Sequence, residues 1–548
     1  MKSAYRAFAA ALLALAGSAF AAPPSQPKLV VVISVDQFSA ALFAQYRASF
    51  SGGLKTLSSG VVFPSGYQSH AATETCPGHS TLLTGRHPAA TGIIANSWFD
   101  AETSSQVYCV YDPAGPVPGR GGQPRGAANL KVPTLGEWMK AADPRSRVYA
   151  VSGKDRAAIM MSGHGPDGVF WWDDERGFTT SVPAGTTEAA RLAPVAAFNA
   201  ALNKRWSAVP PVWKPLDARC ITGGSVRFGS LTIENTLPPK GYEGSWNDPV
   251  NLKYLRGSPA LDQVTLDLAT QFVDRFKLGA GAAPDLLAVS LSATDYVGHR
   301  YGSQGPEMCD QLAQLDRALG VFLTHLASLK IPMVVVLTAD HGSVDAAERV
   351  AERGFPAERV STDVLGDVGR AVQAEFKLDY VPLAGDAQQI NITSFGEPDA
   401  ALNARIAEAT MKMLRARPDV VAVFTKAEAL AAVPRPGTPA DELTLLERFH
   451  ESTDVARSGD ILVAYKPYSS GGAPAAFGDY VAGHGSPWNY DRRVPMLFWW
   501  PGASGFEQPL PVETVDIAPT LAALLKLPAP AVDGRCLDLD RGAGTICR

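Results

Sequence analysis

Aspartate and histidine residues occur in this sequence at spacings that suit a metal ion. Asp295 and His299 are four residues apart in TDYVGHRYG, so on a helical turn their side chains face the same way. A carboxylate and an imidazole in this relation can share a Zn²⁺ ion, which accepts both ligand types. Asp340 and His341 are adjacent in ADHGS, and His484 lies between two glycines in VAGHGSPW. Taken singly, each histidine is more often structural, but together these residues predict a metal centre.

Thr75, in the stretch ATETCPGHSTLLTG, is a candidate nucleophile. A Thr-x-Pro before a helix is usually only a turn with a helix N-cap, and this alternative stays open on local evidence. A threonine hydroxyl is a poor nucleophile at its ordinary pKa, but coordination to a metal ion activates it. His79, four residues on, falls within the following helix, so we expect it to pack there rather than to act as a general base.

The elements that must position these residues are short apolar runs ending in polar side chains, as buried parallel strands do. KLVVVISVD ends at Asp36, PDLLAVSLSATD at Asp295 and PMVVVLTADH next to Asp340. RVYAVSGKDR ends near Lys154 and Arg156, and VPMLFWWPG is a further run near the C-terminus. Because ligands of open α/β sheets bind beyond the carboxyl ends of the strands, we expect these charged residues to meet there.

Helical patterns lie between the strand-like runs, for example over residues 307–329. The alternation predicts the α/β class, with a doubly wound, mostly parallel sheet flanked by helices. Three regions break the pattern. Residues 111–128 are rich in Gly and Pro and predict a loop. Residues 165–255 are rich in Trp, Gly and Pro and predict an irregular insertion, and residues 345–480 mix short strands with helices such as 398–416 and predict a cap.

The composition limits the class of protein and its compartment. The chain has 548 residues and a formal net charge of −5, without an evident basic face, so nucleic acid is not an expected partner. Residues 1–21 have two early basic residues, an apolar run and a small-x-small site, which predict a signal peptide cut after Ala21. We therefore expect residues 22–548 to form an exported catalytic domain, periplasmic or secreted, without a membrane anchor.

Six cysteines fit an exported protein, in which disulfides are permitted. None forms a CxxC pair, so a thiolate metal site is not expected. Cys536 and Cys547 are close enough in sequence to close a small loop, but the sequence does not choose among the pairings of the six: Cys76, Cys109, Cys220, Cys309, Cys536 and Cys547.

Taken in order, the motifs resemble those of the alkaline phosphatase superfamily of two-metal hydrolases: Asp36, Thr75-Cys-Pro, Asp295-x-x-x-His299, Asp340-His341-Gly and His484-Gly. The resemblance runs from about residue 28 to the C-terminal ETVDIAPTLAALLKL. Sulfatases of this superfamily carry a modified cysteine in Cys-x-Pro-x-Arg. Here Cys76 is one residue out of register and no arginine follows, so a sulfatase is disfavoured.

The resemblance implies two Zn²⁺ ions and the residues that hold them. One ion would be held by Asp295, His299 and His484. The other would be held by Asp36, Asp340, His341 and the hydroxyl oxygen of Thr75, which would attack phosphorus and form a phospho-threonine intermediate. An additional structural Ca²⁺ is left open.

Three further residues favour a phosphate monoester as the substrate. Lys154 and Arg156 follow a predicted strand. Asn96, in GIIANSWFD, comes after Thr75 in the chain. This set resembles that of the threonine-nucleophile bacterial alkaline phosphatases of the PhoK type, whose Asn, Lys and Arg bind phosphoryl oxygens. From the spacing alone, Lys154 and Arg156 could equally form a solvated basic turn.

Two alternatives are carried forward. The first is a phosphodiesterase or nucleotide pyrophosphatase with the same metals, since that group keeps the Thr and Asn but lacks the Lys/Arg pair. The second is a catalytically silent metal-binding surface protein, which an intact nucleophile and ligand set argue against. We expect small phosphate esters as substrates and a monomer, and we expect Trp98, Trp171 and Trp172 to be packing residues; the natural substrate remains open.

Overall fold

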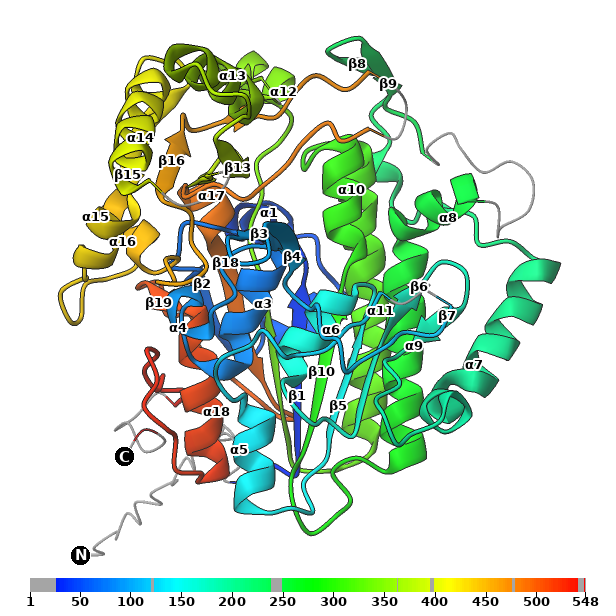
Figure 1. Ribbon diagram of the computed structural model, residues 1–548. Coiled ribbons are helices and arrows are strands. Elements are labelled where there is room, and N and C mark those ends of the chain that lie inside the picture. The colour runs from blue at the N-terminus through cyan, green and yellow to red at the C-terminus, as the bar shows by residue number, and fades with distance from the viewer. Residues whose placement is uncertain are drawn as a thin grey trace, which may run out of the picture.

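The computed structural model describes residues 26–119, 123–237, 249–361, 363–394, 399–475, 479–540 and 547. Its described part contains a nine-stranded sheet with the strand order β19-β2-β18-β11-β1-β10-β5-β6-β7 (Figure 1). The strands are β1 (Leu29–Val35), β2 (Val61–Tyr67), β5 (Val148–Ser152), β6 (Gly168–Asp173), β7 (Gly177–Thr179), β10 (Asp285–Leu291), β11 (Met333–Thr338), β18 (Arg493–Trp499) and β19 (Val512–Glu513).

The centre of the sheet is parallel. β1 pairs in parallel with β10 and β11, and β5 pairs in parallel with β10 and β6. This confirms the predicted mostly parallel α/β sheet. The strand expected over VPMLFWWPG is β18, but it runs antiparallel to both neighbours, β11 and β2. An apolar run shows that a strand is buried, but it does not reveal the strand's direction.

Alternate residues of β1 enter two separate hydrophobic cores, because successive side chains of a strand point to opposite faces. Leu29, Val31, Ile33 and Val35 belong to one core, and the intervening Val30 and Val32 belong to the other. Helices cover both faces of the sheet (Figure 1). The first core includes α9 (Pro259–Phe276), α10 (Ala293–Tyr301) and α11 (Pro306–Ser328); the second includes α3 (Thr75–Thr84), α5 (Leu135–Ala142), α6 (Asp155–Ser162) and α18 (Ile517–Leu525).

The three tryptophans are core residues. Trp172 packs in the first core, and Trp98 and Trp171 pack in the second. Residues 165–255, which we expected to be irregular, contain β6 and β7 of the main sheet and the 21-residue helix α7 (Glu188–Ala208). The hydrophobic pattern of α7 is weak, because few of its residues are buried, and for that reason the sequence did not indicate it.

Residues 345–480 contain a sheet of their own with the strand order β13-β14-β16-β15. Its strands are β13 (Leu383–Gly385), β14 (Gln389–Ile392), β15 (Val420–Thr425) and β16 (Ile461–Tyr465), and α13 (Val364–Phe376) and α14 (Ala400–Arg415) pack on it around a third core. In Figure 1 these yellow and green elements lie together at the upper left, beyond one edge of the main sheet.

The expected signal peptide, residues 1–21, lies outside the described residues. Among the residues that are described, no helix is both long and apolar enough to cross a membrane. The cysteines pair as Cys76–Cys109, Cys220–Cys309 and Cys536–Cys547, so the C-terminal pair closes the short loop that its spacing allowed.

Candidate active site

The parallel register brings three aspartates to one edge of the sheet. Asp36 follows β1, Asp295 lies in the first turn of α10 just after β10, and Asp340 follows β11. All three side chains are buried. Because β1 is level with both neighbours, the chain leaves the three strands at the same height, and this places the carboxylates together.

Gln37 ties these carboxylates together. Its φ of 68° turns the chain sharply directly after Asp36. Its backbone N–H donates to Asp340 Oδ1 at 3.1 Å, and its side-chain amide donates to Asp295 Oδ1 at 3.0 Å. This residue could not be proposed from the sequence, because no local motif marks a glutamine in the left-handed region.

The first candidate metal group is Asp295, His299 and His484, whose ligand atoms all lie within 4.8 Å of one another. Asp295 Oδ1 is 3.2 Å from His299 Nε2 and 3.4 Å from His484 Nε2. The other ring nitrogens donate to backbone carbonyls, His299 Nδ1 to Ala482 at 2.8 Å and His484 Nδ1 to Thr73 at 2.9 Å. These bonds fix the tautomer in which each Nε2 carries a lone pair for a metal.

The second candidate group is Asp36, Asp295 and His341. His341 Nε2 lies 3.5 Å from Asp36 Oδ1 and 3.3 Å from Asp340 Oδ2, and its Nδ1 donates to the carbonyl of Gly342 at 3.0 Å. Asp340 therefore adjoins this group through His341. Asp295, which we had assigned to one ion, lies between the two groups.

The buried polar atoms of these groups test whether a metal fits. Both oxygens of Asp36, Asp340 Oδ2 and His341 Nε2 make no hydrogen bond of good geometry among the described residues; their polar contacts are ion pairs with Lys154, with His79 and with one another. Burial and the Asp340 carboxylate raise the pKa of Asp36 well above its usual value. Buried, uncompensated carboxylates are costly, and divalent cations offset that cost. The oxygen and imidazole donors fit zinc and related transition metals.

Thr75 is the first residue of α3, so its hydroxyl lies at the start of the helix. The Thr75-Cys-Pro stretch is thus the first turn of the helix and not a turn before it, and the N-cap residue is Glu74. Gly78 lets the helix approach the metal groups, because a Cβ there would lie 1.9 Å from the carbonyl oxygen of Asp340. Arg156 Nη2 donates to Thr75 Oγ1 at 3.3 Å.

His79 is fully buried and does not contact the Thr75 hydroxyl. Its Nδ1 lies 2.8 Å from the backbone carbonyl of Thr75 and 3.1 Å from Asp340 Oδ2, and its Nε2 lies 3.1 Å from Ser290 Oγ. It is therefore a packing residue that also contacts a candidate metal ligand, and its spacing from Thr75 gave no sign of that second contact.

Lys154 is buried between the two metal groups. Its Nζ lies 2.5 Å from Asp36 Oδ2 and 2.6 Å from Asp295 Oδ2. Although burial opposes it, the carboxylates of Asp295 and Asp36 raise the pKa of Lys154 above its ordinary value. Lys154 is thus a fixed ammonium and part of the site, not a solvated basic turn.

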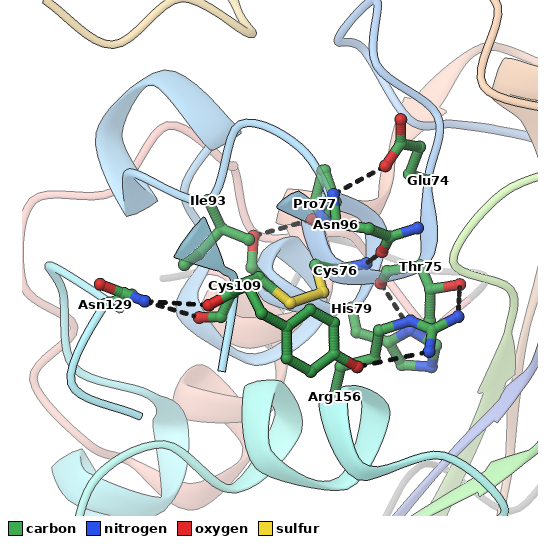
Figure 2. Close-up of a disulfide and its surroundings, with 12 residues drawn as sticks. Glu74, Thr75, Cys76, Pro77, His79, Ile93, Asn96, Cys109, Asn129 and Arg156 are labelled. Atoms are coloured by element: carbon green, nitrogen blue, oxygen red, sulfur yellow. Dashed lines mark hydrogen bonds between the residues drawn. A yellow bond between two sulfur atoms is a disulfide. The ribbon is translucent and has the colours of Figure 1, made fainter. Parts of the chain in front are cut away.

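Asn96 is held with its amide nitrogen free to donate. Its backbone N–H donates to Glu74 Oε2 at 2.7 Å, and its Oδ1 accepts the N–H of Cys76 at 2.9 Å (Figure 2). An amide whose oxygen is occupied in this way presents its NH₂ group, which is the end that binds a phosphoryl oxygen.

Three residues that the sequence did not indicate surround Arg156. The Tyr108 hydroxyl donates to Asp155 Oδ1 at 2.8 Å, Arg156 Nη1 donates to the Tyr108 oxygen at 3.5 Å, and Arg125 Nε donates to Asp155 Oδ2 at 2.8 Å. Burial raises the pKa of Tyr108 to about 12, so the phenol stays protonated. Asp155 directly precedes Arg156 in α6, whereas Tyr108 and Arg125 come from a hairpin and a loop earlier in the chain.

The sheet is mostly parallel and has two groups of carboxylates and imidazoles at its carboxyl edge, and the helix that begins at Thr75 packs against them through Gly78 and His79. Together these features indicate a hydrolase of the alkaline phosphatase superfamily. Residues 30–467 match the family model of type I phosphodiesterase / nucleotide pyrophosphatase. The chain therefore belongs to that family.

Two relatives are similar over nearly their whole length. Alkaline phosphatase PhoD of Zymomonas mobilis is 44% identical, over 96% of this chain and 90% of that one. Alkaline phosphatase PhoK of a Sphingomonas species is also 44% identical, over 95% of this chain and 92% of that one. The crystal structure of wild-type alkaline phosphatase PafA has a TM-score of 0.79 at 26% identity, over 94% of this chain and 99% of that one.

Proposed function

We propose that the protein is a metal-dependent alkaline phosphatase that hydrolyses phosphate monoesters through a phospho-threonine intermediate on Thr75. The observation that carries this proposal is the position of two cations. Lys154 lies between the carboxylates of both metal groups, and Arg156 contacts the nucleophile oxygen itself. A monoester dianion needs more positive charge around it than a diester does.

The relatives support the same reading. Both 44%-identical proteins are named alkaline phosphatases. A variant of PafA has been crystallised in which a threonine, an asparagine, a lysine and an arginine are replaced. The spacing from its threonine to its asparagine, and from its lysine to its arginine, equals that from Thr75 to Asn96 and from Lys154 to Arg156 here.

The residues divide the chemistry between them. Asp295, His299 and His484 would hold one ion, and Asp36, Asp340, His341 and the hydroxyl oxygen of Thr75 would hold the other. When bound, the ions would supply positive charge that lowers the pKa of the Thr75 hydroxyl and stabilises the leaving oxygen. We propose Zn²⁺ for both, because structural and catalytic zinc sites use this donor set.

Thr75 is the group that forms and breaks bonds. Its oxygen attacks phosphorus while the bond from phosphorus to the ester oxygen breaks, and the alcohol leaves. Water then attacks the phospho-threonine, releases inorganic phosphate and restores the hydroxyl. Asn96, Lys154 and Arg156 bind the non-bridging oxygens and hold phosphorus in line with Thr75 throughout.

A phosphodiesterase with the same metals is the second candidate, because the matching family model bears that description. The two functions are separated by the ratio of kcat/KM on p-nitrophenyl phosphate to that on bis(p-nitrophenyl) phosphate. We expect the monoester to be preferred. A preference for the diester would make the phosphodiesterase the better-supported function. Export through a signal peptide at residues 1–21 and a monomeric domain over 22–548 complete the proposal.

Metal removal is expected to abolish activity, and Zn²⁺ is expected to restore it. The orphaned carboxylate and imidazole atoms of the two groups motivate this prediction. His484→Ala should lower the affinity for metal by more than the roughly 10–100-fold that loss of a residue supporting a metal ligand costs, because it removes a proposed ligand itself. His325, which contacts Asp274 outside the site, provides the matched control His325→Ala. Metal content, measured by elemental analysis, and activity are determined on the same samples. Full activity with no metal present would refute the metal site.

The pH optimum is expected to be alkaline, roughly pH 8–10, because attack requires deprotonated Thr75 and the dianionic monoester. Lys154 and Arg156 do not limit the alkaline side. Against the effect of burial, neighbouring groups raise both pKa values above their ordinary 10.5 and 12.5, so both positive charges persist as pH rises through this range. The profile of kcat/KM for p-nitrophenyl phosphate tests this, and a maximum near pH 5 contradicts it.

A further inference from the structure

The Cys76–Cys109 disulfide joins the nucleophile helix to a hairpin (Figure 2). Cys76 directly follows Thr75, and Cys109 directly follows β4 (Ser105–Tyr108), which pairs with β3 (Ser97–Asp100). Both cysteines are fully buried. Asn96, immediately before β3, bonds to both: its Oδ1 accepts the N–H of Cys76 and its backbone carbonyl accepts the N–H of Cys109, each at 2.9 Å.

The hairpin has little burial of its own: Trp98, which packs in the second core, is the one buried residue of its two strands, so the disulfide is a further anchor. β3 and β4 form a two-stranded sheet separate from the main sheet, and most of their residues are exposed or half-buried. An isolated two-stranded hairpin is at best marginally stable in water. The base of this hairpin carries Asn96 and Tyr108, so any movement of the base would move two residues of the phosphate site. A cross-link next to Thr75 prevents that movement.

Tyr108 connects the anchored hairpin to Arg156. Its hydroxyl accepts from Arg156 Nη1 at 3.5 Å and donates to Asp155 Oδ1 at 2.8 Å, and the guanidinium of Arg125 lies 4.7 Å from the centre of its ring. Arg156 in turn donates to Thr75 Oγ1. The contacts thus form a closed ring from Thr75 through the disulfide, Tyr108 and Arg156 back to Thr75. Asn129 adds bonds to the carbonyls of Tyr108 and Cys109 at 3.3 and 3.2 Å.

We infer that the Cys76–Cys109 disulfide and Tyr108 are positioning elements for the phosphate monoester: they hold Asn96 and Arg156 at the distance from Thr75 that the transferred group requires. This inference rests on the proposed phosphatase function. Neither element touches the reacting atoms. Their loss should therefore weaken the contacts to non-bridging oxygens while leaving the nucleophile and the metal groups in place.

The first test replaces the disulfide by Cys76→Ser with Cys109→Ser. The matched control replaces the Cys220–Cys309 disulfide, which joins α11 to a segment distant from the site, in the same way. We expect monoester kcat/KM to fall on the order of tenfold, the effect of one weakened charge-assisted contact, and diester kcat/KM to fall by less than about threefold. The control should keep the wild-type ratio of the two substrates, and metal content should be unchanged in both.

The second test keeps the disulfide and therefore does not depend on the folding of the cysteine variant. Tyr108→Phe removes only the hydroxyl, and Tyr111→Phe makes the same change in a 46% exposed ring nearby. Tyr108→Phe should lower the monoester-to-diester ratio and Tyr111→Phe should not. If Tyr108→Phe and the disulfide variant both keep the wild-type ratio in an active enzyme, the inference is wrong. If instead the wild-type protein, loaded with metal, does not hydrolyse monoesters, the proposed function is wrong.

Discussion

Thr75→Ala is expected to depress the hydrolysis of monoesters and of diesters together, by a factor on the order of 10⁴ or more, as the loss of a covalent nucleophile does in other hydrolases. The hydroxyl oxygen is the only protein group in the proposed pathway that forms a bond to phosphorus. The variant should fold and bind its metals, because the Thr75 hydroxyl contributes one hydrogen bond with Arg156 and the helix around it is packed by its other residues. Steady-state kinetics on both p-nitrophenyl esters measure the loss.

Two controls separate the covalent role of Thr75 from a structural one. Thr75→Ser keeps a hydroxyl and should keep most of the activity. In the wild type, acid quenching during turnover followed by mass spectrometry should find phosphate on the peptide that contains Thr75. Retention of activity within about tenfold of wild type by Thr75→Ala, at the level of a single weakened contact, contradicts a nucleophile.

The candidate metal ligands could be proposed from sequence because each follows a recognisable local pattern. Asp36, Asp295 and Asp340 each come directly after an apolar run, and parallel strands bring such positions to one edge. His299 is one helical turn from Asp295, so its direction is fixed by α10. The remaining candidate ligands were proposed because the order of these residues along the chain resembles the order in the superfamily.

The supporting residues could not be proposed because their partners are distant in sequence. Gln37 bonds to Asp295 and Asp340, and its left-handed backbone has no local motif. Tyr108 and Arg125 lie in or near a Gly/Pro-rich stretch, whose sequence predicts a loop but not its path. The direction of β18 is a further example, since hydrophobicity records burial and not orientation.

For Lys154 and Arg156, the local sequence did not predict the role, and the site residues they contact are distant in the chain. Their spacing after β5 was compatible with a solvated basic turn, and only the resemblance favoured a role in phosphate binding. In the fold, Lys154 is 3% exposed and bonded to two aspartates, and Arg156 reaches the nucleophile. A buried cation and a half-buried one at this position are costly to desolvate unless anions compensate them, and the monoester dianion adds to that compensation.

Lys154→Ala combined with Arg156→Ala is therefore expected to lower monoester kcat/KM on the order of 10²-fold or more, since each charge-assisted contact contributes roughly 1.5–3 kcal/mol and 1.4 kcal/mol is a factor of ten. Diester kcat/KM should fall much less, because a diester carries one charge fewer on its non-bridging oxygens. The variant should thus shift toward phosphodiesterase behaviour. Kinetics with both p-nitrophenyl esters, at equal metal content, measure the shift.

The matched control removes the same two residue types away from the site, as Lys140→Ala with Arg145→Ala. Lys140 pairs with Asp167 and Arg145 with Asp143 at the surface, so this variant should keep both activities. Lys154 also neutralises Asp36 and Asp295, so its removal can weaken metal binding, and zinc must be measured in the double variant. An equal loss of both activities with zinc fully bound would assign the two cations to general positioning of the site. The preference for monoesters would then have to arise from the metal ions and Asn96, the remaining groups of the site that can meet the phosphoryl oxygens.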